Sequence, residues 1–501
     1  MSRPRVKIVY ANADAQSSND KEFSIRTREI ERPPVVTNDD VDHTKLAKKI
    51  YNKKPKSYAD LVNELKGTGT LYEDPDFPAE TSSVYPSKKH KRFDWKRPSE
   101  LVDNPMLFEG GSSRFDVQQG ELGDCWVLAA VASLCQYQHL LERVVPTDQD
   151  FEENYVGAFR FNFWQFDHWE EVIVDDRLPT NRGKLIFMHS DSKNEFWSAL
   201  FEKAYAKLNG NYESLAGGTQ AEAMVDFTGG LCESFELQGD LPQDFFHQME
   251  KNVARCSLMG CSIDTGEVEG DVGNGLLSGH AYSVTGVQAV KNHQLIRVRN
   301  PWGKVEWRGA WSDNSREWNQ ISDDEKEELG LVSSDDGEFW MSYKDFISNF
   351  TKLEICHLGP EAFASDTAKA HWQMIAESGE WSKNVTAGGC RNYLGTFATN
   401  PQYKVEIVDP DSDDEDDCGH VLIGLQQKDM RKKKLPFYTV GYVVYTLDDP
   451  NAERLDLQYF RTHKSVAKSD FSNTREVCGQ HKLKPGHYVI VPSSFRPNEE
   501  A

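Results

Sequence analysis

Cys125 has the sequence context of a reactive thiol. It lies in residues 118–134, QQGELGDCWVLAAVASL, where a turn containing glycine precedes an apolar run with helical spacing. This pattern predicts that Cys125 lies in the first turn of a buried helix. There, the helix dipole and the unpaired N–H groups stabilise a thiolate, which is the nucleophilic form of cysteine. A small buried hydrophobic residue is the commoner role for an arbitrary cysteine, so other residues must decide.

A histidine and an asparagine follow in the order that thiol catalysis needs. His280 opens the strand-like segment HAYSVTGV, and Asn300 ends LIRVRN and begins NPWG. In such an arrangement the imidazole takes the thiol proton and the asparagine orients the ring. Gln119 lies six residues before Cys125. Its amide and the Cys125 backbone N–H are candidate donors to an oxyanion. An ordinary turn residue is the alternative role for Gln119.

The composition indicates a globular protein with an acidic surface. Of 501 residues, 38% are hydrophobic, and 80 Asp and Glu against 57 Lys and Arg give a net charge of −23. A field of this sign repels phosphate backbones, which argues against nucleic acid and favours divalent cations as partners. The N-terminal segment lacks the apolar core of a secretory signal, and the longest apolar run, 126–135, is too short to span a bilayer. The nine cysteines form no CxxC pair. We therefore expect a cytoplasmic protein with reduced thiols.

Three regions divide the chain. Residues 1–70 form a polar arm with a short helix, in which Ser57 and Asp60 form a capping box and Gly67 ends the helix. From about residue 71 to 350, helical and strand-like patterns alternate, which predicts an α+β fold, with two lobes as one arrangement. Beyond about residue 353, short alternating runs such as YKVEIV, FYTVGYVVY and HYVIVP predict an all-β sandwich.

Seven motifs resemble the calpains, calcium-dependent cysteine proteases of the papain-like clan. In order, they are LYEDPDFPAE, GELGDCWVLAA, NEFWSALFEKAYAKLNG, GHAYSVTGV, IRVRNPWG, EWRGAWSD and DGEFWMSYKDF. The resemblance implies a papain-like core with lobe I at 71–218 and lobe II at 219–352. FATNPQY and GHYVIVPS resemble the C2-like sandwich that follows this core, here at 353–501. Conventional calpains continue with a penta-EF-hand domain that pairs with a small subunit. This sequence stops at residue 501, so that pairing is not implied and a monomer is expected.

The resemblance also implies a role for each candidate residue. Cys125 would be the nucleophile, His280 the general base and acid, Asn300 the residue that orients His280, and Gln119 the oxyanion donor. Trp302 would be a wall residue of the substrate cleft, wedged between the lobes of the inactive enzyme. Because the cysteine and the histidine belong to different lobes, activity would require the lobes to close, with residues 215–219 as a candidate hinge.

Calcium is the cofactor that the resemblance implies. The best EF-hand candidate, DPDSDDEDDCGH from residue 409, lacks the glycine and the glutamate that such a loop needs. Two sites within the lobes are implied instead, with oxygen ligands that suit calcium rather than zinc. The implied ligands of the first site are the side chains of Asp116 and Glu195 and the carbonyls near Glu109 and Gly111. Those of the second are the side chains of Glu306, Asp313, Asp336 and Glu338 and the carbonyl of Ser334.

Arg114 would connect the two lobes. The resemblance implies that it reaches Glu338 once calcium has ordered the loop that carries the glutamate. For any one of the implied acidic ligands, a solvated loop charge is the alternative. The sandwich has a further acidic run at 409–417, followed by the basic run 431–434. These are either two solvated loops or a latch that responds to calcium or phospholipid.

Three functions remain open from the sequence. The leading hypothesis is a calcium-activated cysteine endopeptidase that makes limited cuts in cytosolic proteins. A transglutaminase-like acyl transferase is the second, since GDCWVLA resembles its Cys-Trp motif, although its third catalytic residue is an aspartate and Asn300 stands here. The third is a catalytically idle adaptor that binds calcium or phospholipid, which would have no need to keep Cys125, His280 and Asn300 together.

Overall fold

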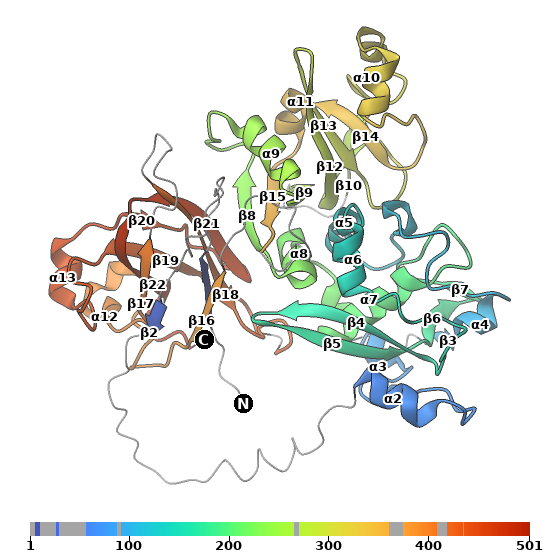
Figure 1. Cartoon of the computed structure of the whole chain (residues 1–501), viewed down its shortest axis with the longest axis horizontal. Helices are drawn as coiled ribbons and strands as arrows, with labels where there is room; N and C mark the ends of the chain where they lie inside the picture. The colour runs from blue at the N-terminus through green and yellow to red at the C-terminus, as the bar shows by residue number, and fades with distance from the viewer. Residues whose placement is uncertain are drawn as a thin grey trace, which may run out of the picture.

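The computed structural model describes residues 6–10, 27–29, 57–87, 92–264, 270–359, 374–407, 418–433 and 435–500. It has three bodies (Figure 1): a first lobe around α5, a second lobe above it around β12, and a β-sandwich at the left. The two lobes and the sandwich match the predicted class, an α+β protease core followed by an all-β domain. The predicted boundaries at residues 70, 218 and 352 stay predictions.

The first lobe is built around one buried helix. Every residue of α5 from Trp126 to Leu134 is buried, as expected for a helix that is apolar on all sides. Its core also takes in α7 and the hairpin β4–β5. The elements are α2 (Tyr58–Leu65), α3 (Thr81–Val84), β3 (Asp94–Lys96), α4 (Pro98–Leu101), η1 (Arg114–Asp116), α5 (Cys125–Leu134), α6 (Gln138–Val144), β4 (Ala158–Gln165), β5 (His168–Asp175), β6 (Leu178–Asn181), β7 (Lys184–Leu185), α7 (Trp197–Leu208), η2 (Tyr212–Leu215) and α8 (Gln220–Thr228).

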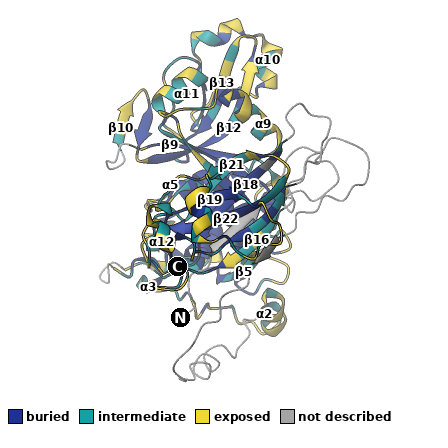
Figure 2. Ribbon diagram, turned by 90° about the vertical axis from the view of Figure 1, so that its left-hand side faces the viewer, coloured by how far each residue is buried: buried dark blue, intermediate teal, exposed yellow. Residues whose placement is uncertain are grey.

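The second lobe is an antiparallel sheet in the strand order β14-β13-β12-β9-β15-β8. Its interior strands are largely buried, whereas α10 is mainly exposed (Figure 2). Helix α8 contacts α5 and β4 of the first lobe as well as β8, β9 and β15, so it joins the two cores. The elements are β8 (Leu231–Glu236), α9 (Phe245–Ala254), β9 (Leu258–Ile263), β10 (Gly270–Gly273), β11 (Leu276–Ser278), β12 (His280–Val290), β13 (His293–Arg299), η3 (Arg316–Gln320), α10 (Asp323–Glu328), β14 (Glu338–Ser342), α11 (Tyr343–Asn349) and β15 (Lys352–His357).

The sandwich consists of two sheets, β16-β1-β18-β21 and β2-β17-β22-β19-β20. Alternate residues of their strands form a common core, which includes Val405, Ile423, Tyr442 and Ile490. The elements are β1 (Val6–Tyr10), β2 (Thr27–Glu29), β16 (Ile375–Gly379), η5 (Arg391–Tyr393), α12 (Leu394–Phe397), β17 (Tyr403–Ile407), β18 (Gly419–Gln427), β19 (Val440–Thr446), α13 (Leu457–Thr462), β20 (Ala467–Lys468), β21 (Glu476–Leu483) and β22 (Gly486–Ser494).

The N-terminal arm differs in part from its prediction. Helix α2 has the predicted capping box between Ser57 and Asp60, and Gly67 has a φ of 77° just beyond the helix. The arm also supplies two strands, which were not predicted. β1 pairs with β16 and β18, and β2 pairs with β17, all antiparallel. Because these partners lie hundreds of residues later in the chain, no local pattern revealed the pairing.

Two ion pairs fasten the sandwich to α8. Both carboxylate oxygens of Glu222 accept hydrogen bonds from Arg431, at 2.8 Å each. Arg475 is hydrogen-bonded to the Asp226 carboxylate through both terminal nitrogens. Burial raises the pKa of Asp226, but for Glu222 the two arginines outweigh burial and lower the pKa. Arg431 of the predicted basic run is therefore an interdomain contact and not a solvated charge. The acidic run at 409–417 lies outside the described residues.

Candidate active site

A rigid loop brings Cys125 to the start of α5. The backbone N–H of Gln118 donates to His189 O at 2.9 Å and that of Glu121 donates to Ile186 O at 2.8 Å. Gly120 lies between these bonds, where a Cβ atom would come within 2.4 Å of Ile186 O, so only glycine fits. Cys125 is the first helical residue and is partly exposed. The structure therefore gives the thiol the predicted place at a helix N-terminus, where a thiolate is stabilised.

His280 and Asn300 form a hydrogen-bonded pair in the second lobe. His280 opens β12, is 2% exposed, and lies opposite Ile263 of β9. Its Nε2 is 2.8 Å from Asn300 Oδ1. The asparagine follows β13 and is fully buried, and its Nδ2 donates to Val305 O at 3.0 Å. Because the amide nitrogen is committed, Oδ1 is the acceptor that faces the ring, and a neutral imidazole then carries its lone pair on Nδ1.

Trp302 connects this pair to the loop before Cys125. Its backbone N–H donates to Asn300 Oδ1 at 3.0 Å, and its ring centroid lies 5.0 Å from that of His280, with the planes tilted by 59°. The indole Nε1 donates to Gln119 Oε1 at 2.9 Å. Gln119 Nε2 donates to Leu122 O at 2.8 Å, and this NH₂ group has a second hydrogen to offer. The structure thus brings the side chains of Gln119, His280, Asn300 and Trp302 into one chain of contacts.

Arg114 reaches across to Glu338, the partner that the resemblance implied, while the ordering of this loop by calcium stays a prediction. Arg114 Nε donates to Glu338 Oε1 at 2.9 Å and Nη2 donates to Oε2 at 2.7 Å, which is a bidentate pair. Thr285 Oγ1 also donates to Oε1 at 2.8 Å, and Arg297 Nε lies 3.6 Å from Oε2. Burial alone would raise the pKa of Glu338, but the hydrogen bonds and charges of these arginines hold it below its ordinary value. Sequence reasoning missed Thr285 and Arg297, which carry no motif of their own.

Helix α5 of the first lobe also contacts the second lobe directly. Ser283 Oγ donates to Ala129 O at 2.7 Å, and Ser133 Oγ donates to Met259 O at 3.1 Å. The guanidinium of Arg299, at the end of β13, lies 4.7 Å from the ring centroid of Phe115 in η1. These contacts hold the middle and last turn of α5 against β12 and β9, and they hold η1 against the end of β13. The sequence did not predict these interlobe contacts, because the two residues of each contact lie more than a hundred residues apart in the chain.

The implied ligands of the first calcium site are held by internal hydrogen bonds. Glu195 Oε1 accepts from the Glu109 backbone N–H at 2.8 Å, and Oε2 accepts from Ser190 Oγ at 2.6 Å. Asp116 accepts from the Ser113 N–H at 2.5 Å and forms a capping box with it. Gly111 has a φ of 109° and turns the chain between Glu109 and Asp116. Burial raises the pKa of both Asp116 and Glu195, so each would gain from a compensating cation.

The implied ligands of the second site lie on two neighbouring loops. Glu306 Oε1 accepts from the N–H groups of Asp336 and Gly337, at 3.0 and 2.8 Å, and Asp313 Oδ2 accepts from the Ser334 N–H at 3.0 Å. Burial, followed by repulsion from neighbouring carboxylates, raises the pKa of Glu306 and Asp313. Asp336 Oδ1 accepts from the Glu338 N–H at 2.9 Å, and burial raises its pKa as well. The Glu338 carboxylate is already occupied by Arg114.

The fit of these residues to calcium is partial. Their oxygen donors and unfavourable burial suit a hard cation. Within the described ranges, however, no three His, Cys, Asp or Glu side chains converge as a metal site would require. Backbone N–H groups hold the carboxylates instead, so loops 109–116 and 306–338 would have to rearrange around an ion. The two implied ligand sets therefore stay predictions.

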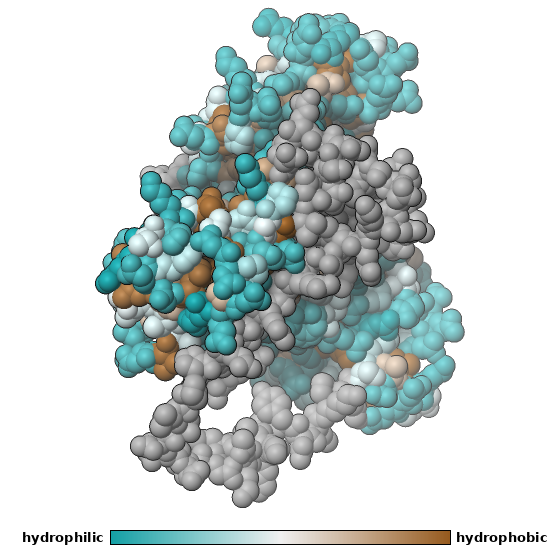
Figure 3. Space-filling view, turned by 60° about the vertical axis from the view of Figure 1, so that its left-hand side comes forward, coloured by the Kyte–Doolittle hydropathy of each residue, from teal (hydrophilic) through white to brown (hydrophobic). Residues whose placement is uncertain are grey.

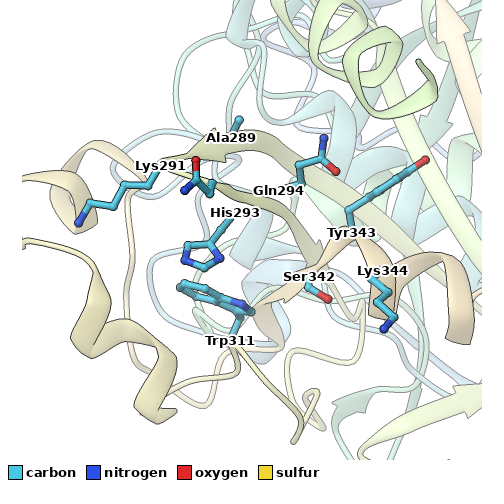
Figure 4. Close-up of a pocket in the computed structure, with 9 residues that line it drawn as sticks. Ala289, Lys291, His293, Gln294, Trp311, Ser342, Tyr343 and Lys344 are labelled. Atoms are coloured by element: carbon cyan, nitrogen blue, oxygen red, sulfur yellow. The ribbon is translucent and has the colours of Figure 1, made fainter. Parts of the chain in front are cut away.

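A separate hollow of about 420 Å³ lies on the second lobe (Figure 4). Trp311 and His293 line one side, with ring centroids 4.8 Å apart, and Lys344 and Tyr343 line the other. Lys291, at its edge, is bound to Gln320 O at 2.7 Å and to Glu325 at 3.1 Å. None of the candidate catalytic residues lines this hollow, so it is separate from the Cys125 and His280 site.

Family comparisons agree with this geometry. The family model described as "Calpain family cysteine protease" matches residues 72–357, and the one described as "Calpain large subunit, domain III" matches residues 377–501. The chain therefore belongs to the calpain family of cysteine proteases. The first match contains Cys125, His280 and Asn300, and the second covers most of the sandwich.

Several named calpains are similar to this chain over most of its length. It is 49% identical over 464 residues to Calpain-A of Drosophila melanogaster, and this match covers 88% of this chain and 56% of the relative. It is 49% identical over 457 residues to Calpain-9 of Homo sapiens, covering 89% of this chain and 66% of the relative. It is 48% identical over 468 residues to Calpain of Schistosoma mansoni, and this match covers 90% of this chain and 62% of the relative. The chain thus spans between about half and two thirds of the length of these relatives.

The surface and the helices of the described residues add one further observation. Hydrophilic residues prevail on the face shown in Figure 3, and hydrophobic ones are scattered among them. None of the helices described is long and apolar enough to cross a membrane.

Proposed function

We propose that this chain is a calcium-activated cysteine endopeptidase that makes limited cuts in protein substrates. The observation that carries the proposal is the hydrogen bond of 2.8 Å between His280 Nε2 and Asn300 Oδ1, in a calpain-family core that also places Cys125 at the start of α5. Asn300 is the residue that separates this arrangement from a transglutaminase triad. A catalytically idle adaptor would not need a buried, oriented imidazole.

In the proposed reaction each residue has a separate task. His280 takes the proton from Cys125, and the thiolate sulfur attacks the carbonyl carbon of the substrate peptide bond. The Cys125 backbone N–H and the Gln119 amide donate to the oxyanion. His280 then gives its proton to the leaving amine as the C–N bond breaks, which leaves a thioester. Water, deprotonated by His280, attacks that thioester, releases the acid product and restores the thiol. Asn300 keeps the ring oriented throughout.

Calcium would act on the position of the lobes and not on the substrate. Asp116 and Glu195, with the carbonyls of Glu109 and Gly111, would hold one ion. Glu306, Asp313 and Asp336, with the carbonyl of Ser334, would hold the other. The Glu338 side chain, which the resemblance also assigns to this site, is bound by Arg114. When bound, the ion supplies positive charge that offsets the buried carboxylates of these loops. Their chain neighbours Arg114 and Glu338 would then be held in the bidentate pair that joins the lobes.

The substrate would be an extended protein segment that lies between the lobes, with Trp302 as part of the wall. We propose that the protein acts in the cytoplasm as a monomer, and that the sandwich carries any calcium-dependent association with phospholipid. The net charge of −23 argues against nucleic acid as a partner.

The test is cleavage of casein by the full chain, with millimolar calcium or with a chelator, beside the Cys125→Ala variant. Calcium-dependent cutting that the substitution abolishes supports the proposal. Cutting that persists in chelator would leave a protease but overturn calcium activation. Incorporation of a primary amine into casein without cutting would favour the transglutaminase alternative. A folded protein that does neither under any condition would favour the adaptor.

A further inference from the structure

Two buried carboxyl groups lie beneath the start of α5, and the proposed reaction does not use them. Asp124 immediately precedes Cys125 and is the residue at which the helix begins, yet its side chain caps no backbone N–H. Glu202 lies in the middle of α7. Each residue is only 1% exposed. In the sequence, Glu202 stands out as a charge within the otherwise apolar segment FWSALFE, but nothing there indicates its partner.

The hydrogen-bond donors available to this pair are too few for two carboxylates. Glu202 Oε2 accepts from the Met188 backbone N–H at 2.9 Å, and among the described residues no N–H or hydroxyl forms a hydrogen bond of normal geometry with Glu202 Oε1 or with either side-chain oxygen of Asp124. The one N–H that approaches the Asp124 carboxyl is its own backbone N–H. The two carboxyls do, however, lie within hydrogen-bonding reach of each other. One carboxyl can donate to another only if it is protonated, so a hydrogen bond between them requires at least one proton on the pair.

The surroundings of the pair favour retention of that proton. Within the part of the chain that is described, no lysine or arginine acts on either carboxyl. Lys203, the next residue of α7, is turned towards Asp175, to which its Nζ donates at 2.7 Å. The other ionisable groups that face the pair are the phenols of Tyr85 and Tyr212, which carry no charge at neutral pH. Burial raises the pKa of Asp124, and burial together with the Asp124 charge raises that of Glu202.

We propose that Asp124 and Glu202 share a proton, and that Glu202 is a positioning residue that acts on Cys125 through Asp124. The shared hydrogen bond ties the first residue of α5 to α7, since the Asp124 carbonyl accepts from the N–H groups of Val127 and Leu128 in the first turn. It also limits the negative charge next to Cys125. A second charge there would oppose the thiolate and weaken the effect of the helix N-terminus. The inference rests on the proposed role of Cys125 as nucleophile.

The first experiment measures how fast iodoacetamide alkylates Cys125 as a function of pH, with the modified peptide identified by mass because the chain has nine cysteines. Glu202→Gln keeps a donor to Asp124 and one negative charge, so its pH midpoint should equal that of the wild type. Asp124→Asn combined with Glu202→Gln removes the charge, so its midpoint should fall by about half a unit to one unit. An unchanged midpoint in the folded double variant would overturn the electrostatic part of the proposal.

The second experiment separates the shared hydrogen bond from simple packing. Glu202→Leu fills similar space but offers Asp124 no donor, so kcat should fall about tenfold with KM little changed, whereas Glu202→Gln should retain kcat within about threefold. Equal kcat values for the Leu and Gln variants would show that no hydrogen bond is shared. Because Glu202→Leu can also fail to fold, a spectroscopic measurement must stand beside it.

That measurement is the infrared C=O stretch of protonated carboxyl groups at neutral pH. Glu202→Gln should lose the intensity of one such group relative to the wild type. The matched control is Asp176→Asn, which removes another fully buried carboxyl, one that is bound to Arg97 and Tyr155. In the iodoacetamide experiment, Asp176→Asn should leave the pH midpoint for alkylation of Cys125 unchanged. An unaltered carboxyl band in Glu202→Gln would overturn the proton sharing, whether or not the protein proves to be a protease.

Discussion

The two halves of the candidate site are held in place in different ways. Cys125 is positioned by its main chain, through the paired loop that contains Gly120 and through the first turn of α5. His280 is positioned by a side chain, since the Asn300 amide binds its ring. The Val305 carbonyl and the Trp302 backbone N–H in turn hold that amide. A base whose orientation depends on one amide is sensitive to a single side-chain change. A nucleophile held by its backbone is sensitive to changes that the backbone cannot absorb.

Replacement of Asn300 by alanine should have the largest effect. It removes the oxygen that accepts from both His280 Nε2 and the Trp302 N–H, so the ring loses its orientation. We expect kcat for casein cleavage to fall about a hundredfold or more. Thermal stability should fall as well, because the buried Val305 carbonyl and Trp302 N–H lose their partner. Asn300→Asp, which keeps an acceptor, should retain more activity than Asn300→Ala. Equal loss in both variants would show that the side-chain oxygen does not orient the imidazole.

Gly120→Ala tests the backbone half of the comparison. The new Cβ would meet Ile186 O at 2.4 Å and the Phe187 Cα at 2.5 Å, and neither backbone atom can move away easily. The free energy of unfolding should fall by about 1–3 kcal/mol, measured by denaturant titration, and activity should fall with it. Gly123→Ala is the matched control, because its Cβ would point into open space. If both variants unfold alike, the loop does not depend on the close approach at Gly120.

Arg114→Ala tests the contact that joins the two halves. Loss of the bidentate pair with Glu338 should raise the calcium concentration for half-maximal activity by about five- to tenfold, while activity at saturating calcium changes little. Arg316→Ala removes a surface pair in which the arginine side chain is 91% exposed, so it should change neither quantity. The same calcium midpoint in Arg114→Ala as in the wild type would show that the Arg114–Glu338 pair is not coupled to calcium activation.

Trp302→Phe should have the smallest effect of the four. It keeps an aromatic ring beside His280 but loses the hydrogen bond from Nε1 to Gln119 Oε1. A single neutral hydrogen bond of this kind contributes about 1 kcal/mol, so kcat/KM should change by about fivefold or less. Gln119→Leu, which also removes the side-chain donor, should lower kcat further. If the two variants match, the Gln119 amide contributes nothing to the oxyanion.

Local sequence carried much of the information on the candidate site. The helix start at Cys125 and the strand start at His280 were predicted from apolar periodicity and turn residues, and the structure has them there. Asn300 was predicted as the last residue of its strand and lies one residue beyond β13. The capping box at Ser57 was predicted equally well. Strand β1, by contrast, was missed because its pairing partners are distant in the chain.

The sequence by itself determined the types of reactive residue, their order and the elements that carry them, because helix starts and strand starts depend on neighbouring residues. Only the tertiary structure decided which of these groups meet. Thr285 and Arg297 join Arg114 at Glu338, and Glu202 reaches Asp124, through contacts between distant segments. The protonation of a buried carboxyl follows from those contacts, since burial and the available donors set its pKa and neither can be read along the chain.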